Sequence, residues 1–261
     1  MKNRWYEIQA KDEGATIYIY DEISSWGITA SQFVKDLNAT KAKTISLRIN
    51  SPGGNVFDGM AIYNALKQHP AKVTSEVDGI AASIASIIAM AGEEIRIAEN
   101  AFFMIHNAWA FAIGSSSDMS KMAETLDKID TQMEKIYAKR TGQEQDKVRM
   151  MMADETWMNA DEALELGFAD SVGDKIAAAA CASFDLTKFR NVPGSLNAGG
   201  ERVEPGTERE LEKFYRDGGM SREMAIAAVA KARRVYQREA DEAVRVKAKG
   251  IADELITLFR A

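Results

Sequence analysis

Short β-rich runs alternate with apolar patterns of helical period over the first 180 residues, and this alternation constrains the fold more than any other feature. Residues 15–20 (ATIYIY) predict a strand, and Thr29 to Gln32 reads as a capping box that opens a helix. Further strands are predicted at 43–50, 72–77, 94–98 and 101–106, and further helices at 56–68 and 81–91. Strands separated by helices are typical of parallel crossover connections, so we expect an α/β fold.

Residues 117–140 form the longest amphipathic pattern of the chain. Six apolar residues recur there at helical spacing: Met119, Met122, Leu126, Ile129, Met133 and Ile136. The helix either covers the sheet or projects from it as an arm. A short helix ending near Gly167 follows.

The composition changes after about Asp185. Residues 191–200 (NVPGSLNAGG) have the Pro, Gly, Ser and Asn content of a linker, and the residues after them are highly charged but nearly neutral overall. We therefore predict a domain at 1–185, a linker at 186–208 and a small charged helical tail at 209–261.

Charge and composition exclude several classes of protein. The formal net charge of −6 argues against nucleic acid as the main partner. One cysteine, Cys181, and two histidines nearly exclude a His/Cys metal site and an internal disulfide, and we expect no metal and no cofactor. No apolar run is long enough to span a bilayer and the N-terminus lacks a signal peptide pattern, so we expect a cytoplasmic protein without a membrane partner.

Two glycine-bearing turns lie between a predicted strand and a predicted helix. The first, residues 50–55 (NSPGGN), is either a plain turn or a site where backbone N–H groups bind an anion; it has neither P-loop nor GxGxxG spacing. The second, residues 78–86 (DGIAASIAS), contains Ser83 among small residues. Ser83 either serves close packing or is a nucleophile, with the Ile84 N–H directed at an oxyanion.

A nucleophilic serine needs a base and an orienting carboxylate. His106 follows an apolar strand and is the candidate base, although a packed core histidine is an equal reading from composition alone. His69 precedes Pro70 at a helix end and is a weak candidate. Asp154 and Glu155 stand beside an aromatic-rich strand and are candidate carboxylates.

Five segments in this order resemble the successive motifs of the Clp-type serine peptidases. They are INSPGG (49–54), GIAAS (79–83), MIH (104–106), YAKRTGQ (137–143) and ETWMNADEALELGFAD (155–170). The resemblance covers about residues 14–175. It implies a Clp/crotonase-type spiral of strand–helix units in which residues 117–140 are a projecting handle.

The resemblance also implies roles for individual residues. Ser83 is the expected nucleophile, His106 the general base, and the N–H groups of Gly54 and Ile84 the oxyanion hole. Glu155 falls where these peptidases usually have aspartate, with Asp154 as the alternative third member. Hydrolysis of peptide bonds in protein substrates is the expected reaction.

Departures from the usual pattern point to a subtype. The chain lacks the longer N-terminal segment that faces a ring-shaped unfoldase, which makes an ATPase partner doubtful, and it carries the charged tail. Both features are similar to the Clp-related head maturation proteases of phages and prophages. Scaffold and capsid proteins are therefore the expected substrates, inside a cytoplasmic procapsid, and interdigitating handles predict a ring-forming homo-oligomer.

Other readings remain open beside this one. The chain could be a general cytoplasmic Clp-like peptidase, an inactive assembly or scaffolding module, a crotonase-type acyl-CoA enzyme or, least favoured, a Ser-Lys peptidase. The tail either tethers the protease to its partners through apolar contacts or is solvated surface. The residues expected to make those contacts are Leu211, Phe214, Tyr215, Met224 and Val229.

Overall fold

The computed structural model divides into two units, residues 1–203 and residues 204–261. Eight strands form one mixed sheet in the first unit. The structure describes residues 5–11, 13–24, 29–174 and 184–196, and the single positions 212, 222, 226, 229 and 230. The main path of the sheet runs β1-β2-β3-β4-β5-β8. The strands on it are β1 (Tyr6–Lys11), β2 (Gly14–Ile19), β3 (Thr44–Ser51), β4 (Lys72–Ala82), β5 (Glu94–Ala98) and β8 (Ser171–Gly173).

The long strand β4 joins two parts of the sheet. Its residues Thr74 to Val77 pair with β5, whereas Ile80 to Ala82 pair in parallel with β6 (Phe102–Ile105). Strand β6 pairs in turn with β7 (Thr156–Met158) in antiparallel orientation. The carboxyl ends of β4 and β6 therefore lie side by side, which is the arrangement that brings residues 83 and 106 together.

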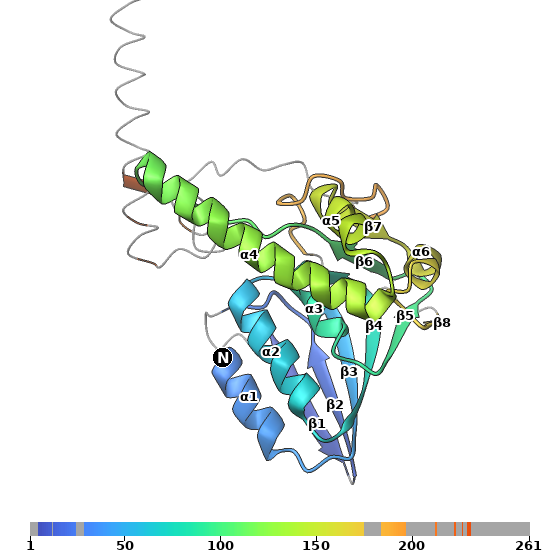
Figure 1. Cartoon of the computed structure of the whole chain (residues 1–261). Helices are drawn as coiled ribbons and strands as arrows, with labels where there is room; N and C mark the ends of the chain where they lie inside the picture. Colours follow the sequence, from blue (N-terminus) through green and yellow to red (C-terminus); the bar gives the residue numbers. More distant parts are fainter. Residues whose placement is uncertain are drawn as a thin grey trace, which may run out of the picture. The chain divides into compact units, whose positions relative to one another are not determined.

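Helices α1 (Ala30–Ala39) and α2 (Val56–Gln68) cover one face of the sheet (Figure 1). Strand β2 shows why: its residues alternate between half-buried and buried, and the buried Ala15, Ile17 and Ile19 belong to the core. Helix α1 begins at the predicted cap, where the Thr29 side chain accepts the N–H of Gln32. Helix α2 has the predicted bounds.

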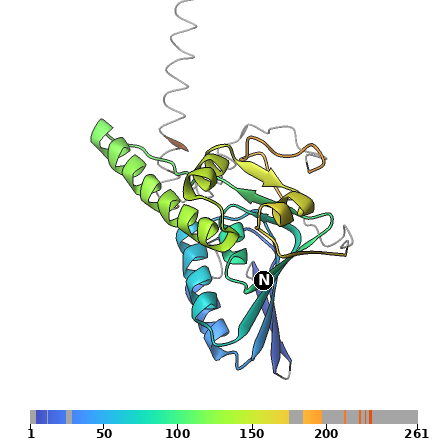
Figure 2. The ribbon, with the colours of Figure 1, turned by 45° about the vertical axis from the view of Figure 1, so that its right-hand side comes forward.

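Helix α4 (Ser116–Thr141) projects beyond the sheet in two views (Figures 1 and 2). Only Met133, Glu134 and Tyr137, near its C-terminal end, are buried. The projecting arm is therefore the correct alternative of the two. The mixed sheet and its helices confirm the predicted α/β fold.

Four elements differ from the predicted ones. Strand β1 and helix α5 (Gln145–Ala153) were not predicted. Strand β4 continues to Ala82, so the small-residue helix α3 (Ile84–Ala89) is shorter than the predicted 81–91. Pairing with β6 keeps residues 80–82 extended, although their side chains are compatible with a helix. Helix α6 (Ala160–Glu165) matches the predicted short helix.

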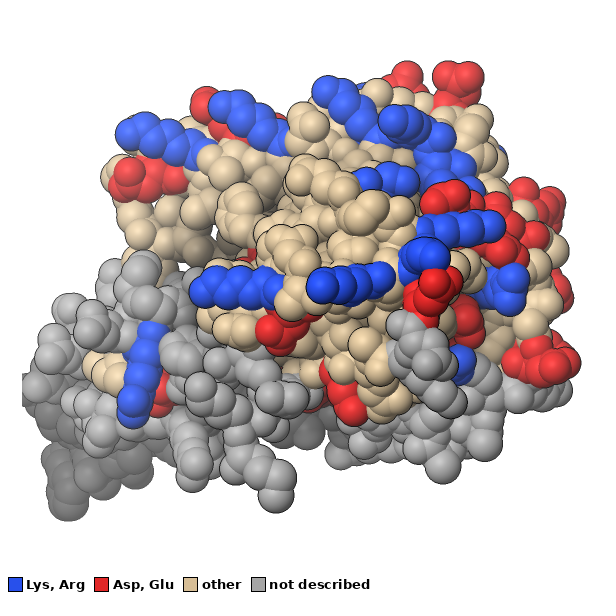
Figure 3. Space-filling model, turned by 90° about the horizontal axis from the view of Figure 1, so that it is seen from below, with Lys and Arg blue, Asp and Glu red and all other residues tan. Residues whose placement is uncertain are grey.

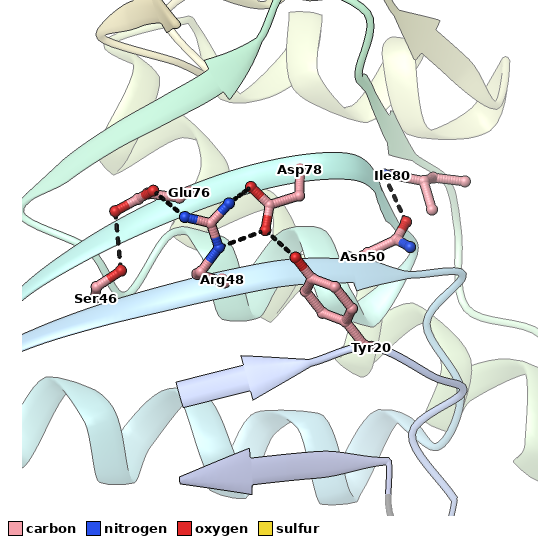
Figure 4. A network of polar contacts seen from close by, with 7 residues as sticks. All are labelled: Tyr20, Ser46, Arg48, Asn50, Glu76, Asp78 and Ile80. Atoms are coloured by element: carbon pink, nitrogen blue, oxygen red, sulfur yellow. Dashed lines mark hydrogen bonds and ion pairs between the residues drawn. The ribbon is translucent and has the colours of Figure 1, made fainter. Parts of the chain in front are cut away.

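The outer face of the sheet carries a polar network. Arg48 on β3 forms ion pairs with Glu76 and Asp78 on β4, and Tyr20 donates a hydrogen bond to Asp78 (Figure 4). The face of the molecule in Figure 3 shows acidic and basic side chains interspersed among uncharged ones. Among the described residues, no helix combines the length and the apolar character needed to cross a membrane.

The five described positions of the second unit, residues 204–261, are all helical. Among them Val229 is buried and Ile226 is 47% exposed. The Arg222 Nε lies 3.9 Å from the Glu212 Oε1. The other residues of the predicted tail contacts, Leu211, Phe214, Tyr215 and Met224, lie outside the described residues, as does Cys181.

Candidate active site

Ser83 is the single residue between β4 and α3, and its backbone is strained. Its φ is 56° and its ψ −130°, a conformation that costs a non-glycine residue about 1–3 kcal/mol. The Ser83 N–H donates to the carbonyl of Met104 on β6 at 3.0 Å. The sharp turn exposes the side chain at the end of the strand, which is the geometry of a nucleophile elbow.

Helix α3 is anchored behind the serine. The Ser86 hydroxyl donates to the Ser83 carbonyl at 2.5 Å and lies 2.6 Å from the hydroxyl of Tyr137 on α4. Tyr137 is buried, and burial raises the pKa of its phenol. Helix α4 therefore stabilises α3, the helix that begins next to Ser83 and helps to set its position.

His106 directly follows β6 and faces Ser83. Ala82 pairs with Met104 across the parallel strands β4 and β6, so Ser83, one residue after Ala82, and His106, two residues after Met104, come close together. The His106 Nε2 lies 2.7 Å from the Ser83 Oγ, within hydrogen-bond distance. This is the contact that a general base requires with its nucleophile.

The environment of His106 keeps its imidazole neutral. Burial lowers the pKa of His106 to about 4; the negative charge of Glu155 opposes this effect, and the positive charges of Lys188 and Arg190 add to it. A neutral imidazole at pH 7 can accept the serine proton.

Glu155 occupies the turn between α5 and β7, and its φ of 51° is the second positive value among the described non-glycine residues. Its side chain is buried, whereas the neighbouring Asp154 is exposed. Within the described chain no hydrogen bond joins Glu155 to His106, so the carboxylate acts on the imidazole through its charge. Burial beside His106 favours Glu155 over Asp154 as the candidate carboxylate.

The glycine turn after β3 lies directly against Ser83. A Cβ added to Gly53 would stand 2.7 Å from the Ser83 Cβ and 3.2 Å from the Ile84 nitrogen. The turn is held by Ile23, which donates to the Gly53 carbonyl at 2.7 Å and accepts from the Asn55 N–H at 2.8 Å. A side chain at residue 53 would therefore displace the serine.

Two backbone N–H groups near Ser83 have no hydrogen-bond partner in the described part of the chain. Because Gly53 and Asn55 bond to Ile23, the N–H of Gly54 points to the opposite side. Ile84 is the first residue of α3, where an N–H has no partner within the helix. These are the two groups that the resemblance to Clp-type peptidases implies as an oxyanion hole.

His69 lies elsewhere, at the C-terminal end of α2, where its Nδ1 accepts the N–H of Ala71 at 3.1 Å. No group of three or more His, Cys, Asp or Glu side chains among the described residues could hold a metal ion.

Residues 184–196 contact the site, although the sequence predicts a linker from residue 186 onward. Phe189 is buried, and its ring centroid lies 5.4 Å from that of His106. The predicted domain boundary at 185 falls inside this packed segment. Its apolar residues Phe184, Leu186, Phe189 and Val192 were the available signal, because a solvated linker does not need them.

Comparisons with known proteins agree with this architecture. The family model described as Clp protease matches residues 2–176. The ATP-dependent Clp protease proteolytic subunits of Streptococcus pneumoniae strains Hungary19A-6 and CGSP14 are each 37% identical over 134 residues, which is 50% of this chain and 68% of theirs. The matched segment and the fold together show that this chain belongs to the Clp protease family.

Proposed function

We propose that the protein is a serine endopeptidase in which Ser83, His106 and Glu155 form the catalytic triad. The observation that carries this proposal is the 2.7 Å contact between the Ser83 Oγ and the His106 Nε2 at a strained turn. Family membership supports the reaction class, peptide hydrolysis. Glu155 contributes by stabilising the positive charge that His106 acquires during the reaction.

The geometry suggests the following course of the reaction. The Ser83 Oγ attacks the substrate carbonyl carbon while its proton passes to the His106 Nε2. The N–H groups of Gly54 and Ile84 donate to the resulting oxyanion. The C–N bond then breaks, the leaving amine takes the proton from His106, and water releases the acyl group by the same steps in reverse.

A fluorophosphonate probe tests the nucleophile directly. We expect one covalent adduct per chain, located by peptide mass spectrometry at Ser83, because the probe requires a serine activated by a base. Ser83→Ala should abolish the label, whereas Ser120→Ala, at an exposed serine on α4, should retain it. Absence of labelling together with tight binding of coenzyme A would favour the acyl-CoA reading over hydrolysis.

Scaffold and capsid proteins are the substrates we propose, acted on by a ring-shaped homo-oligomer. The projecting handle supports the oligomer, and the second unit beyond the matched residues supports a role other than the general one. Co-expression with capsid and scaffold proteins encoded beside the gene should give defined cleavage products by mass spectrometry. The products should be missing with Ser83→Ala; intact capsid proteins beside an active protease would contradict this substrate class.

A further inference from the structure

Residues 184–196, here called the strap, lie beyond the segment that matches the Clp family and pack on the candidate triad. Phe189 belongs to a buried cluster with Ile80, Ala82 and Met104, and Trp157 packs against the same cluster. Its ring meets the ring of His106 edge-on at 5.4 Å and that of Trp157 at 5.7 Å. The Phe189 ring thus limits how far the imidazole can turn.

The strap also holds the third candidate residue by its backbone. The N–H groups of Arg190 and Asn191 each donate to the Glu155 Oε1 at 2.7 Å, and the Trp157 Nε1 adds a longer bond of 3.3 Å. Three donors converge on Oε1, and the Nε of Arg190 lies 3.8 Å from the other oxygen, Oε2, so the strap engages both oxygens of the Glu155 carboxylate.

Side chains of the same two strap residues secure the turn that carries Glu155. The Arg190 guanidinium donates to the Ala153 carbonyl at 3.0 Å, and the Asn191 amide donates to the Asp154 carbonyl at 2.6 Å. Both bonds stabilise a turn in which Glu155 has an unfavourable positive φ. Nearer the start of the strap, Lys188 pairs with Glu22 at 2.5 Å.

We propose that the strap is a positioning element of the active site, in which the Arg190 and Asn191 N–H groups fix the Glu155 carboxylate and Phe189 fixes the His106 ring. The inference rests on the proposed triad. On this proposal, residues 2–176, which match the Clp family, do not by themselves fix the positions of the triad side chains; the strap beyond them is also needed.

The strap also affects the pKa of His106. Burial and the charges of Lys188 and Arg190 lower the pKa of the imidazole. Loosening the strap should therefore raise this pKa toward its ordinary value of about 6.5. A purely structural role, in which loss of the strap only reduces the amount of folded protein, would leave the pH profile of the remaining activity unchanged.

Two pairs of variants of the full chain test the proposal with a short fluorogenic peptide. Phe189→Ala removes the brace on the imidazole, and Phe189→Leu retains much of the apolar contact. Asn191→Pro removes the N–H bond to Glu155 together with the side-chain bond, and Asn191→Ala removes the side-chain bond alone. Ser195→Ala, at the exposed end of the strap, is the control for the segment as a whole.

We expect Phe189→Ala and Asn191→Pro to lower kcat by about 10- to 100-fold with little change in KM, since misplaced catalytic groups have effects of that size. The acid limb of the kcat/KM profile should move to higher pH. Phe189→Leu and Asn191→Ala should fall between these variants and the parent. Thermal unfolding and circular dichroism verify that each variant is folded.

The outcomes separate this inference from the proposed function. If the parent is labelled at Ser83 and Phe189→Ala and Asn191→Pro retain its kcat and pH profile, the strap has no positioning role although the triad stands. Higher activity in these variants would mean that the strap inhibits the enzyme, which also overturns the proposal. If Ser83→Ala keeps full activity, the triad itself is wrong.

Discussion

Ser83→Ala is expected to reduce kcat for a peptide substrate by about 10⁴- to 10⁶-fold. The hydroxyl that lies 2.7 Å from the His106 Nε2 is the proposed nucleophile, and the alanine side chain has no atom that could form the acyl-enzyme. Substrate binding should be nearly unchanged, because the backbone N–H groups of the glycine turn and of α3 remain. Initial rates with a fluorogenic peptide measure the effect.

His106→Ala should cause a loss of similar size, and the double variant should be no worse than either single one. The two side chains act as a unit, so removing one already disables the other. His69→Ala is the matched control: this histidine contacts the backbone of Ala71 and should leave kcat/KM within a few-fold of the parent. Additive losses in the double variant would contradict a shared step.

Arg48→Met is expected to lower the free energy of unfolding by about 2–3 kcal/mol at pH 8. The Arg48 guanidinium donates from Nε and Nη2 to the two carboxylate oxygens of Asp78, at 2.9 and 2.6 Å (Figure 4). The Asp78 side chain is only 2% exposed, so the variant leaves a buried charge without its cation. Arg48 itself is 27% exposed, which places the expected cost below that of a fully buried pair.

The loss should depend on pH in a defined direction. Burial raises the pKa of Asp78, and Tyr20 and Arg48 oppose that rise. Without Arg48 the pKa rises further, so the native state holds a proton that the unfolded state has released. Stability of the variant should then fall as the pH rises above about 4, the ordinary value for aspartate, and the deficit should be smaller at pH 5 than at pH 8.

Arg96→Met on the neighbouring strand β5 is the control for charge and size. Its ion pair with Glu94 is exposed, with 53% of the Arg96 side chain accessible, so little change in stability is expected. Urea unfolding at the two pH values measures both variants. Equal effects of the two substitutions, or a larger deficit at pH 5, would show that the buried Asp78 does not need Arg48.

Elements whose pattern is local could be predicted from the sequence alone. The apolar spacing of residues 56–68 predicted α2 with its observed bounds, and residues 94–98 predicted β5 in the same way. The motifs around Ser83 and His106 were also recognisable separately, because each joins one strand end to one reactive side chain. The 2.7 Å contact between them follows from the register of β4 and β6, which the motifs alone do not specify.

Features that depend on partners distant in the chain could be seen only in the folded structure. Residues 80–82 are extended because β6 pairs with them, although small residues also suit a helix. Glu155 and Asp154 are chemically alike neighbours, and only the turn with φ of 51° buries the first and exposes the second. The strap reaches Glu155 across 35 and 36 residues of sequence, and no local pattern encodes such a contact, because its hydrogen bonds come from backbone N–H groups that every residue except proline carries.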